Sequence, residues 1–231
     1  GDWSGYGRGI DSTATPNAVP SPGEFRPMWR GWLHTVTFLA AVPGGILLIL
    51  GADRASGKVG ASVYFASLLL GFGTSAAYHR LARRDRAVRI MQRMDHSMIF
   101  VLIAGTYTPI CLLGMSRSWG IAMLCGVWGV ALFGILIKQF AFERFRILEY
   151  AMYPLLGWGA VIATPTLLAT MSVVELVLVA LGGVLYTVGI PFLIRERPNP
   201  WPKHFGYHEI WHTFTVAAGA CHFAAIALLL S

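Results

Sequence analysis

The polar side chains best placed to hold a metal ion fall in three short segments of a largely apolar chain. In the last segment, His208 and His212 are four residues apart, so on a helix their rings would project from one face, about 5–6 Å apart. Two such rings can bind one ion together, and imidazole is a common ligand of zinc. Ser75 and His79 have the same spacing in the first segment, and Asp95 lies in the second.

Three neutral imidazoles that leave one coordination position open are typical of catalytic zinc, whereas structural zinc sites are closed by four protein ligands. Asp95 is the candidate either to hold a metal-bound water or to be the fourth ligand. The same carboxylate has a plainer interpretation, because an acidic residue at a membrane boundary can pair with neighbouring arginines or extend to the headgroups. The metal interpretation therefore depends on whether the fold brings the three segments together.

The other histidines are weaker candidates for metal ligands. His96 would point about 100° away from Asp95 on a helix, which favours a hydrogen bond at the interface or between helices. His204 falls in a polar loop. His222 lies about 15 Å beyond His212 along a helix, too far to share the same ion. We expect His222 to be hydrogen-bonded inside the helix bundle.

The elements that must position these residues are seven apolar runs, each long enough to cross roughly 30 Å of hydrocarbon as a helix. The composition agrees, since 13% of the residues are charged against about 25% in soluble domains. The chain is therefore predicted to be an all-α, multi-pass protein of the cell membrane. A seven-transmembrane helix bundle would occupy residues 29–231, after a disordered cytoplasmic tail at 1–28. The runs lie at about 29–50, 61–79, 94–114, 119–138, 147–168, 173–194 and 208–230.

Lysine and arginine are distributed unequally between the two sides of this bundle. The loops and helix ends on the side of the N-terminus carry fourteen of them, and those on the opposite side carry three: Arg54, Lys58 and Arg117. Cytoplasmic loops are enriched in these residues, so the N-terminus is predicted in the cytoplasm and the C-terminus outside. The net charge of +7 is explained by the same loops, and no nucleic-acid partner is needed to account for it.

This orientation places the three polar segments at one depth. The second run travels inward and ends at His79, whereas the third and seventh runs travel outward and begin near Asp95 and His208. The apolar runs alone would not require these three ends to match. The coincidence favours a single metal site at the cytoplasmic boundary.

The order of these residues resembles the hemolysin III family: Ser75-x-x-x-His79, then Asp95, then His208-x-x-x-His212. That family is grouped with the progestin and adipoQ receptors in a superfamily that includes the alkaline ceramidases. The resemblance covers nearly the whole chain outside the N-terminal tail. It implies that the three histidines bind zinc, that Asp95 acts through a zinc-bound water, and that Ser75 lies beside it. It also implies seven helices with a cytoplasmic N-terminus.

Three classes of function remain open. The first is a zinc-dependent hydrolase of ceramide-like lipid amides at the inner leaflet, in which Asp95 takes a proton and Ser75 bonds the developing oxyanion. The second is a receptor, sensor or membrane-homeostasis protein in which a structural zinc joins the second and seventh helices. The third is a pore-former, which ranks last because four of the runs have almost no polar residues in mid-membrane. Membrane lipids are the expected partners, and the sequence leaves the substrate and the oligomeric state open.

Overall fold

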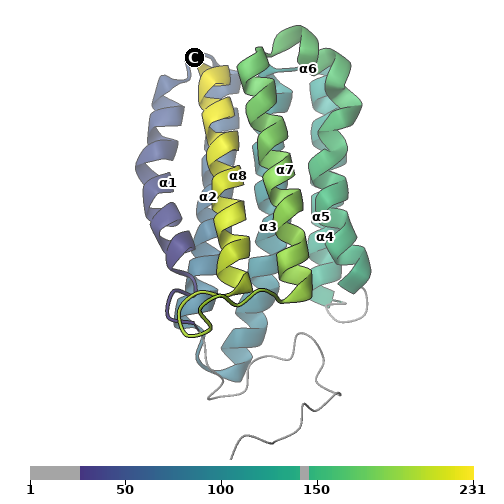
Figure 1. The fold of residues 1–231 in the computed structure, drawn as a ribbon. Helices are drawn as coiled ribbons and strands as arrows, with labels where there is room; N and C mark the ends of the chain where they lie inside the picture. The colour runs from purple at the N-terminus through teal and green to yellow at the C-terminus, as the bar shows by residue number, and fades with distance from the viewer. Residues whose placement is uncertain (1–26, 141–145) are drawn as a thin grey trace, which may run out of the picture.

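The computed structural model describes residues 27–140 and 146–231, with the backbone alone for 146–150. Within these residues seven helices are long and apolar enough to cross a membrane, and there is no strand (Figure 1). The predicted fold class, an all-α bundle of seven transmembrane helices, is therefore confirmed. The predicted N-terminal tail lies almost wholly outside the described residues, and its assignment stays a prediction.

Each crossing packs on its neighbours in the chain, and α1 also contacts α8, so the first and last helices close the bundle. Helix α3 lies inside it, in contact with α2, α4, α5 and α8. The crossings are α1 (Trp32–Gly51), α2 (Ala55–Leu81), α3 (Asp85–Leu113), α4 (Arg117–Phe140), a fifth made of α5 (Arg146–Trp158), η1 (Gly159–Ala163) and α6 (Thr164–Thr170), then α7 (Val173–Arg195) and α8 (Tyr207–Leu230).

Two helices are longer than their apolar runs. Helix α2 begins at Ala55 and α3 at Asp85, earlier than the predicted starts at about 61 and 94. Hydropathy marks only the part of a helix that lies in hydrocarbon, and a helix can continue into the headgroup region. Arginine is a good helix former, so the basic stretch before Met94 extends α3 without ending it. As a result Asp95 lies well inside α3.

Small residues allow α2 and α3 to approach closely. A Cβ added at Gly60 would lie 2.8 Å from the Cα of Pro109, and one added at Gly105 would overlap Ser67. Close approach through small residues is the usual way in which membrane helices associate, because lipid supplies no hydrophobic driving force between them. This contact fixes the register of the two helices that carry Ser75 and Asp95.

The fifth crossing is broken, although the sequence predicts one helix over 147–168. It changes to a 3₁₀-helix at Gly159, and α6 restarts beside Pro165, which has no N–H to continue the helical bonds. The Tyr107 hydroxyl of α3 pairs with the freed backbone groups. It accepts from the Ala160 N–H at 2.6 Å and lies 2.8 Å from the Gly157 carbonyl oxygen. Such pairing is what makes irregular backbone tolerable within a membrane.

The outer surface of the bundle is apolar. Leu132, Phe133 and Leu136 on α4 are each more than half exposed, and so are Val173 and Val177 on α7. In water such a surface would promote aggregation. In a bilayer the same side chains face lipid, which is consistent with a multi-pass membrane protein.

Candidate metal centre

The three polar segments meet at the end of the bundle where α1, α3 and α8 begin and α2 ends (Figure 1). Helix α8 starts here because Glu209 caps it, accepting the Gly206 N–H at 2.8 Å. The first turns of α8 carry His208 and His212, and the last turns of α2 carry His79. The structure brings these three histidines together, with one ring nitrogen from each within 4.8 Å of the others.

The spacing of the three rings suits a shared ion. The Nε2 atoms of His79 and His208 are 3.0 Å apart, and the His212 ring centroid lies 5.0 Å from that of His79 and 4.5 Å from that of His208. Nitrogens bound at 2.0–2.1 Å to one tetrahedral zinc lie about 3.3–3.4 Å from each other. Three imidazoles without a thiolate are also a typical zinc donor set. The residues present therefore fit a zinc ion.

Asp95 stands slightly apart from the three nitrogens. Its Oδ2 is 4.0 Å from the His79 Nε2, more than the separation of two ligands on one zinc. Among the described residues it forms no ion pair with an arginine, but the buried Lys138 ammonium on α4 acts on it electrostatically, and Ser75 hydrogen-bonds its carboxylate. Two polar atoms at this distance are commonly bridged by a water molecule.

His34 on α1 is a site residue that the sequence analysis missed. It is 6% exposed, and its ring stacks on that of His212 with centroids 3.7 Å apart. Its Nδ1 lies 2.8 Å from the Ser75 hydroxyl and its Nε2 lies 3.1 Å from the Thr215 hydroxyl. A signal was available, because a lone histidine near the start of the first apolar run lies at the same depth as the other histidines.

The direction of these hydrogen bonds follows from the single proton of each hydroxyl. Thr215 donates its proton to the His212 carbonyl oxygen at 2.8 Å, so it can only accept from the Nε2–H of His34. The Nδ1 of the neutral ring is then an acceptor for the Ser75 proton. The Asp95 carboxylate is a second acceptor within hydrogen-bonding reach of the same hydroxyl. His34 thus joins α1 to α2 and α8 directly beside the three histidines.

An ion pair holds the loop side of the site. Arg30 donates from Nε to the Glu209 carboxylate at 2.5 Å, and Glu209 is 1% exposed. This pair ties the segment just before α1 to the first turn of α8, one residue from His208.

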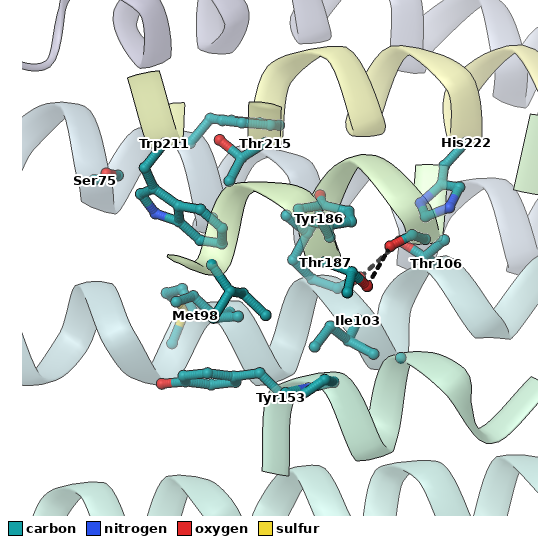
Figure 2. A pocket seen from close by; sticks show the side chains of 18 of the residues that line it. Ser75, Met98, Ile103, Thr106, Tyr153, Tyr186, Thr187, Trp211, Thr215 and His222 are labelled. Carbon is teal, nitrogen blue, oxygen red and sulfur yellow. Dashed lines mark hydrogen bonds between the residues drawn. The ribbon is translucent and has the colours of Figure 1, made fainter. Parts of the chain in front are cut away.

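The site opens into a cavity within the bundle. The cavity has a volume of about 180 Å³ and is lined mainly by apolar side chains of α3, α5, α7 and α8. Asp95, His208 and His212 line one end of it. Figure 2 shows Ser75 toward that end and His222 toward the other. As predicted, His222 is hydrogen-bonded within the bundle, from Nε2 to the Val179 carbonyl oxygen at 3.2 Å.

Comparison with known proteins agrees with this picture. Residues 24–223 match the model of a family described as Haemolysin-III related. The chain is 34% identical over 196 residues to the Hemolysin-3 homolog of Bacillus subtilis (strain 168), covering 84% of this chain and 89% of that relative. It is 31% identical over 196 residues to Hemolysin-3 of Bacillus cereus, covering 84% of this chain and 86% of the relative.

A more distant relative is the human Monocyte to macrophage differentiation factor, 24% identical over 217 residues, covering 90% of this chain and 88% of that protein. The family match spans six of the seven crossings and most of the last, and includes every residue of the candidate centre. With the seven apolar helices it makes the chain a multi-pass membrane protein, and the predicted resemblance is confirmed. The chain belongs to the Haemolysin-III related family.

Proposed function

We propose that this protein is a zinc-dependent hydrolase of lipid amides that acts at the inner leaflet of the membrane. The observation that carries the proposal is the convergence of three histidines, two of which line one end of an apolar cavity. His79, His208 and His212 would hold the zinc. A bound zinc ion lowers the pKa of a coordinated water to about 7 and polarises a carbonyl group.

The residues around the zinc ligands have separate tasks in this proposal. Asp95, 4.0 Å from the His79 Nε2, would accept a proton as the general base. Ser75 would donate a hydrogen bond to the substrate oxygen as charge develops on it. That donation requires the Ser75 hydroxyl to turn away from its two neighbouring acceptors, the His34 Nδ1 and the Asp95 carboxylate. His34 and Asp95 would together set the resting direction of the hydroxyl.

The substrate class is inferred from where the site lies. The apolar lining of the cavity suits hydrocarbon chains, and the histidines at its end suit a polar group close to the headgroup boundary. The charge distribution of the loops favours the cytoplasmic side for this end. Ceramide-like amides are the substrates that the resemblance to the alkaline ceramidases implies.

A second candidate is a receptor, sensor or membrane-homeostasis protein in which zinc is structural. The contacts of His34 and the Arg30–Glu209 ion pair support it, because they hold the same ends of α1, α2 and α8 together. Membrane lysis is a third candidate, suggested by the names of the two Bacillus relatives. The apolar cavity gives lysis less support, since a water-filled pore needs a polar lining through the bilayer.

The test combines metal analysis with a hydrolysis assay on protein purified without chelator. We expect about one zinc per chain, cleavage of a fluorescent ceramide analogue, loss of both after chelation and their return when zinc is added. His208→Ala combined with His212→Ala should abolish zinc binding. His204→Ala, in the exposed loop before α8, is the matched control and should retain it. Full zinc retention by the double variant would rule out this centre, whereas bound zinc without cleavage of any lipid amide would favour the structural role.

A further inference from the structure

The cavity has a second polar region far from the candidate metal centre. His222 on α8 and Tyr186 on α7 both line it, with ring centroids 5.9 Å apart. His222 lies ten residues beyond His212, which is about 15 Å along α8 at 1.5 Å per residue. Apolar side chains, among them Met98, lie between Ser75 and this second polar region (Figure 2).

This pair has hydrogen-bonding capacity to spare. Because the Nε2–H of His222 donates to the Val179 carbonyl oxygen, its Nδ1 is left as an acceptor. Over the part of the chain that the structure describes, neither this nitrogen nor the Tyr186 hydroxyl has a hydrogen-bond partner. Together they offer one acceptor and one hydroxyl that can both donate and accept.

Two threonines in the same region are different. The Thr106 hydroxyl donates to the Leu102 carbonyl oxygen at 2.7 Å, and the Thr187 hydroxyl donates to the Gly183 carbonyl oxygen at 2.8 Å. Each has therefore used its only proton on its own helix. The unused donor in this part of the cavity belongs to the tyrosine and the unused ring acceptor to the histidine.

Local packing presents both groups to the cavity. A Cβ added at Gly182 would overlap the His222 ring, so this glycine is what allows the ring to lie against α7 and reach Val179. Among the described residues, only the Tyr64 hydroxyl is both fully enclosed and without a hydrogen-bond partner. The Tyr186 hydroxyl has no partner among these residues either, so it must keep some accessible surface. The cavity is a space that Tyr186 lines, and it could therefore supply a partner for this hydroxyl.

We propose that His222 and Tyr186 bind a hydroxyl group in the middle of a lipid chain. The ligand of the cavity would then be a lipid with one polar group at the candidate metal centre and a hydroxyl about 15 Å further along its chain. This inference rests on the proposed function only for the lipid nature of the ligand and the place of its first polar group. The ligand hydroxyl donates to the His222 Nδ1 and accepts from the Tyr186 hydroxyl, which pairs two groups that are costly to leave unpaired in apolar surroundings.

The test compares octadecanoic acid with its monohydroxylated isomers, in which the hydroxyl is moved along the chain. Binding to the protein in nanodiscs is measured by displacement of a fluorescent fatty acid. We expect isomers with a mid-chain hydroxyl to bind roughly five- to thirtyfold more tightly than the plain acid. Tyr186→Phe should remove this preference while leaving the affinity for the plain acid unchanged. Tyr153→Phe makes the same change elsewhere on the cavity wall and should keep the preference.

Equal affinity of the wild-type protein for all the acids would overturn the inference. So would a preference that survives Tyr186→Phe, or a failure of every acid to bind. The assay measures no hydrolysis, so its outcome is separate from that of the proposed function. A protein that selects the hydroxylated chain but cleaves no lipid amide would contradict the hydrolase proposal alone.

Discussion

His34 is held between two hydroxyl groups, and both belong to residues beside the candidate zinc ligands. Ser75 is one helical turn from His79 on α2, and Thr215 donates to the carbonyl oxygen of His212 on α8. The ring of His34 also stacks on the ring of His212. Groups that orient metal ligands in this way commonly change metal affinity without touching the metal. At the scale of single residues, the site is therefore larger than its three histidines and one carboxylate.

Replacement of His34 by Phe should weaken zinc binding roughly 10–100-fold, the usual effect of losing a residue that orients ligands. Phenylalanine keeps an aromatic ring against His212 but loses both hydrogen bonds. Zinc affinity is measured by competition with a chelator, and the absorption spectrum of the cobalt-substituted protein reports the ligand geometry. His34→Gln, which can still donate to Thr215, should recover part of the affinity. An unchanged affinity and spectrum in His34→Phe would mean that His34 only fills space.

Replacement of Asp95 by Asn distinguishes a general base from a zinc ligand. If Asp95 accepts a proton without binding the metal, the variant should keep its zinc and its thermal stability while hydrolysis falls roughly 10²–10⁴-fold. If Asp95 is a direct ligand, zinc content and stability should fall together. His79→Ala is the control, because it should reduce zinc binding in either case. Normal zinc with unchanged hydrolysis would remove Asp95 from the proposed mechanism.

At the scale of elements, the broken fifth crossing shows how one side chain can support irregular backbone inside a membrane. The change from α5 to η1 leaves helical backbone groups without their usual partners, and the Tyr107 hydroxyl reaches them from α3. The same crossing lines the cavity with Tyr153 and Trp158. A continuous helix would present a different face there, so the shape of the cavity depends on this break.

Tyr107→Phe should therefore destabilise the protein. An unpaired buried backbone group costs about 1–3 kcal/mol, and about 1 kcal/mol lowers Tm by roughly 2–4 °C in a chain of this size. A decrease of several degrees is expected in a thermal unfolding experiment in detergent. Tyr64→Phe is a matched control, since the Tyr64 hydroxyl is buried with no hydrogen-bond partner among the described residues. Its removal should leave Tm unchanged or raise it. Equal losses in both variants would show that the hydroxyl of Tyr107 has no special role.

At the scale of the whole molecule, the site lies at one end of the bundle. The leaflet that supplies the lipid therefore depends on which side of the membrane this end faces. The loop between α2 and α3 is at the same end as the three histidines, whereas the loop between α1 and α2 is at the other end. The excess of lysine and arginine at the histidine end predicts that it faces the cytoplasm.

Cysteine labelling in intact cells tests this orientation. In a variant without the three native cysteines, Arg83→Cys should resist a membrane-impermeant maleimide and react only after the cells are opened. Asp53→Cys, in the exposed loop between α1 and α2, should react in intact cells and serves as the control. The opposite pattern would reverse the topology and move the candidate site to the outer leaflet.

The sequence alone was sufficient for the properties that depend on neighbouring residues. A run of apolar residues must be helical to satisfy its backbone in lipid, so seven runs predicted the seven crossings now seen. The four-residue spacing of His208 and His212 put both rings on one face of α8, and the common depth of the run ends led to His79. Each of these inferences needs only helical geometry and the direction in which the chain crosses the membrane.

Only the tertiary structure decided the contacts that depend on how the helices rotate and pack. His34 is 41 residues from Ser75 and 181 from Thr215, and Arg30 is 179 residues from Glu209. Hydropathy places a residue at a depth but does not say which neighbour it faces, because a lipid-facing and a protein-facing helix side can be equally apolar. For this reason the stacking of His34 on His212, the break beside Tyr107 and the cavity between the helices became visible only in the folded chain.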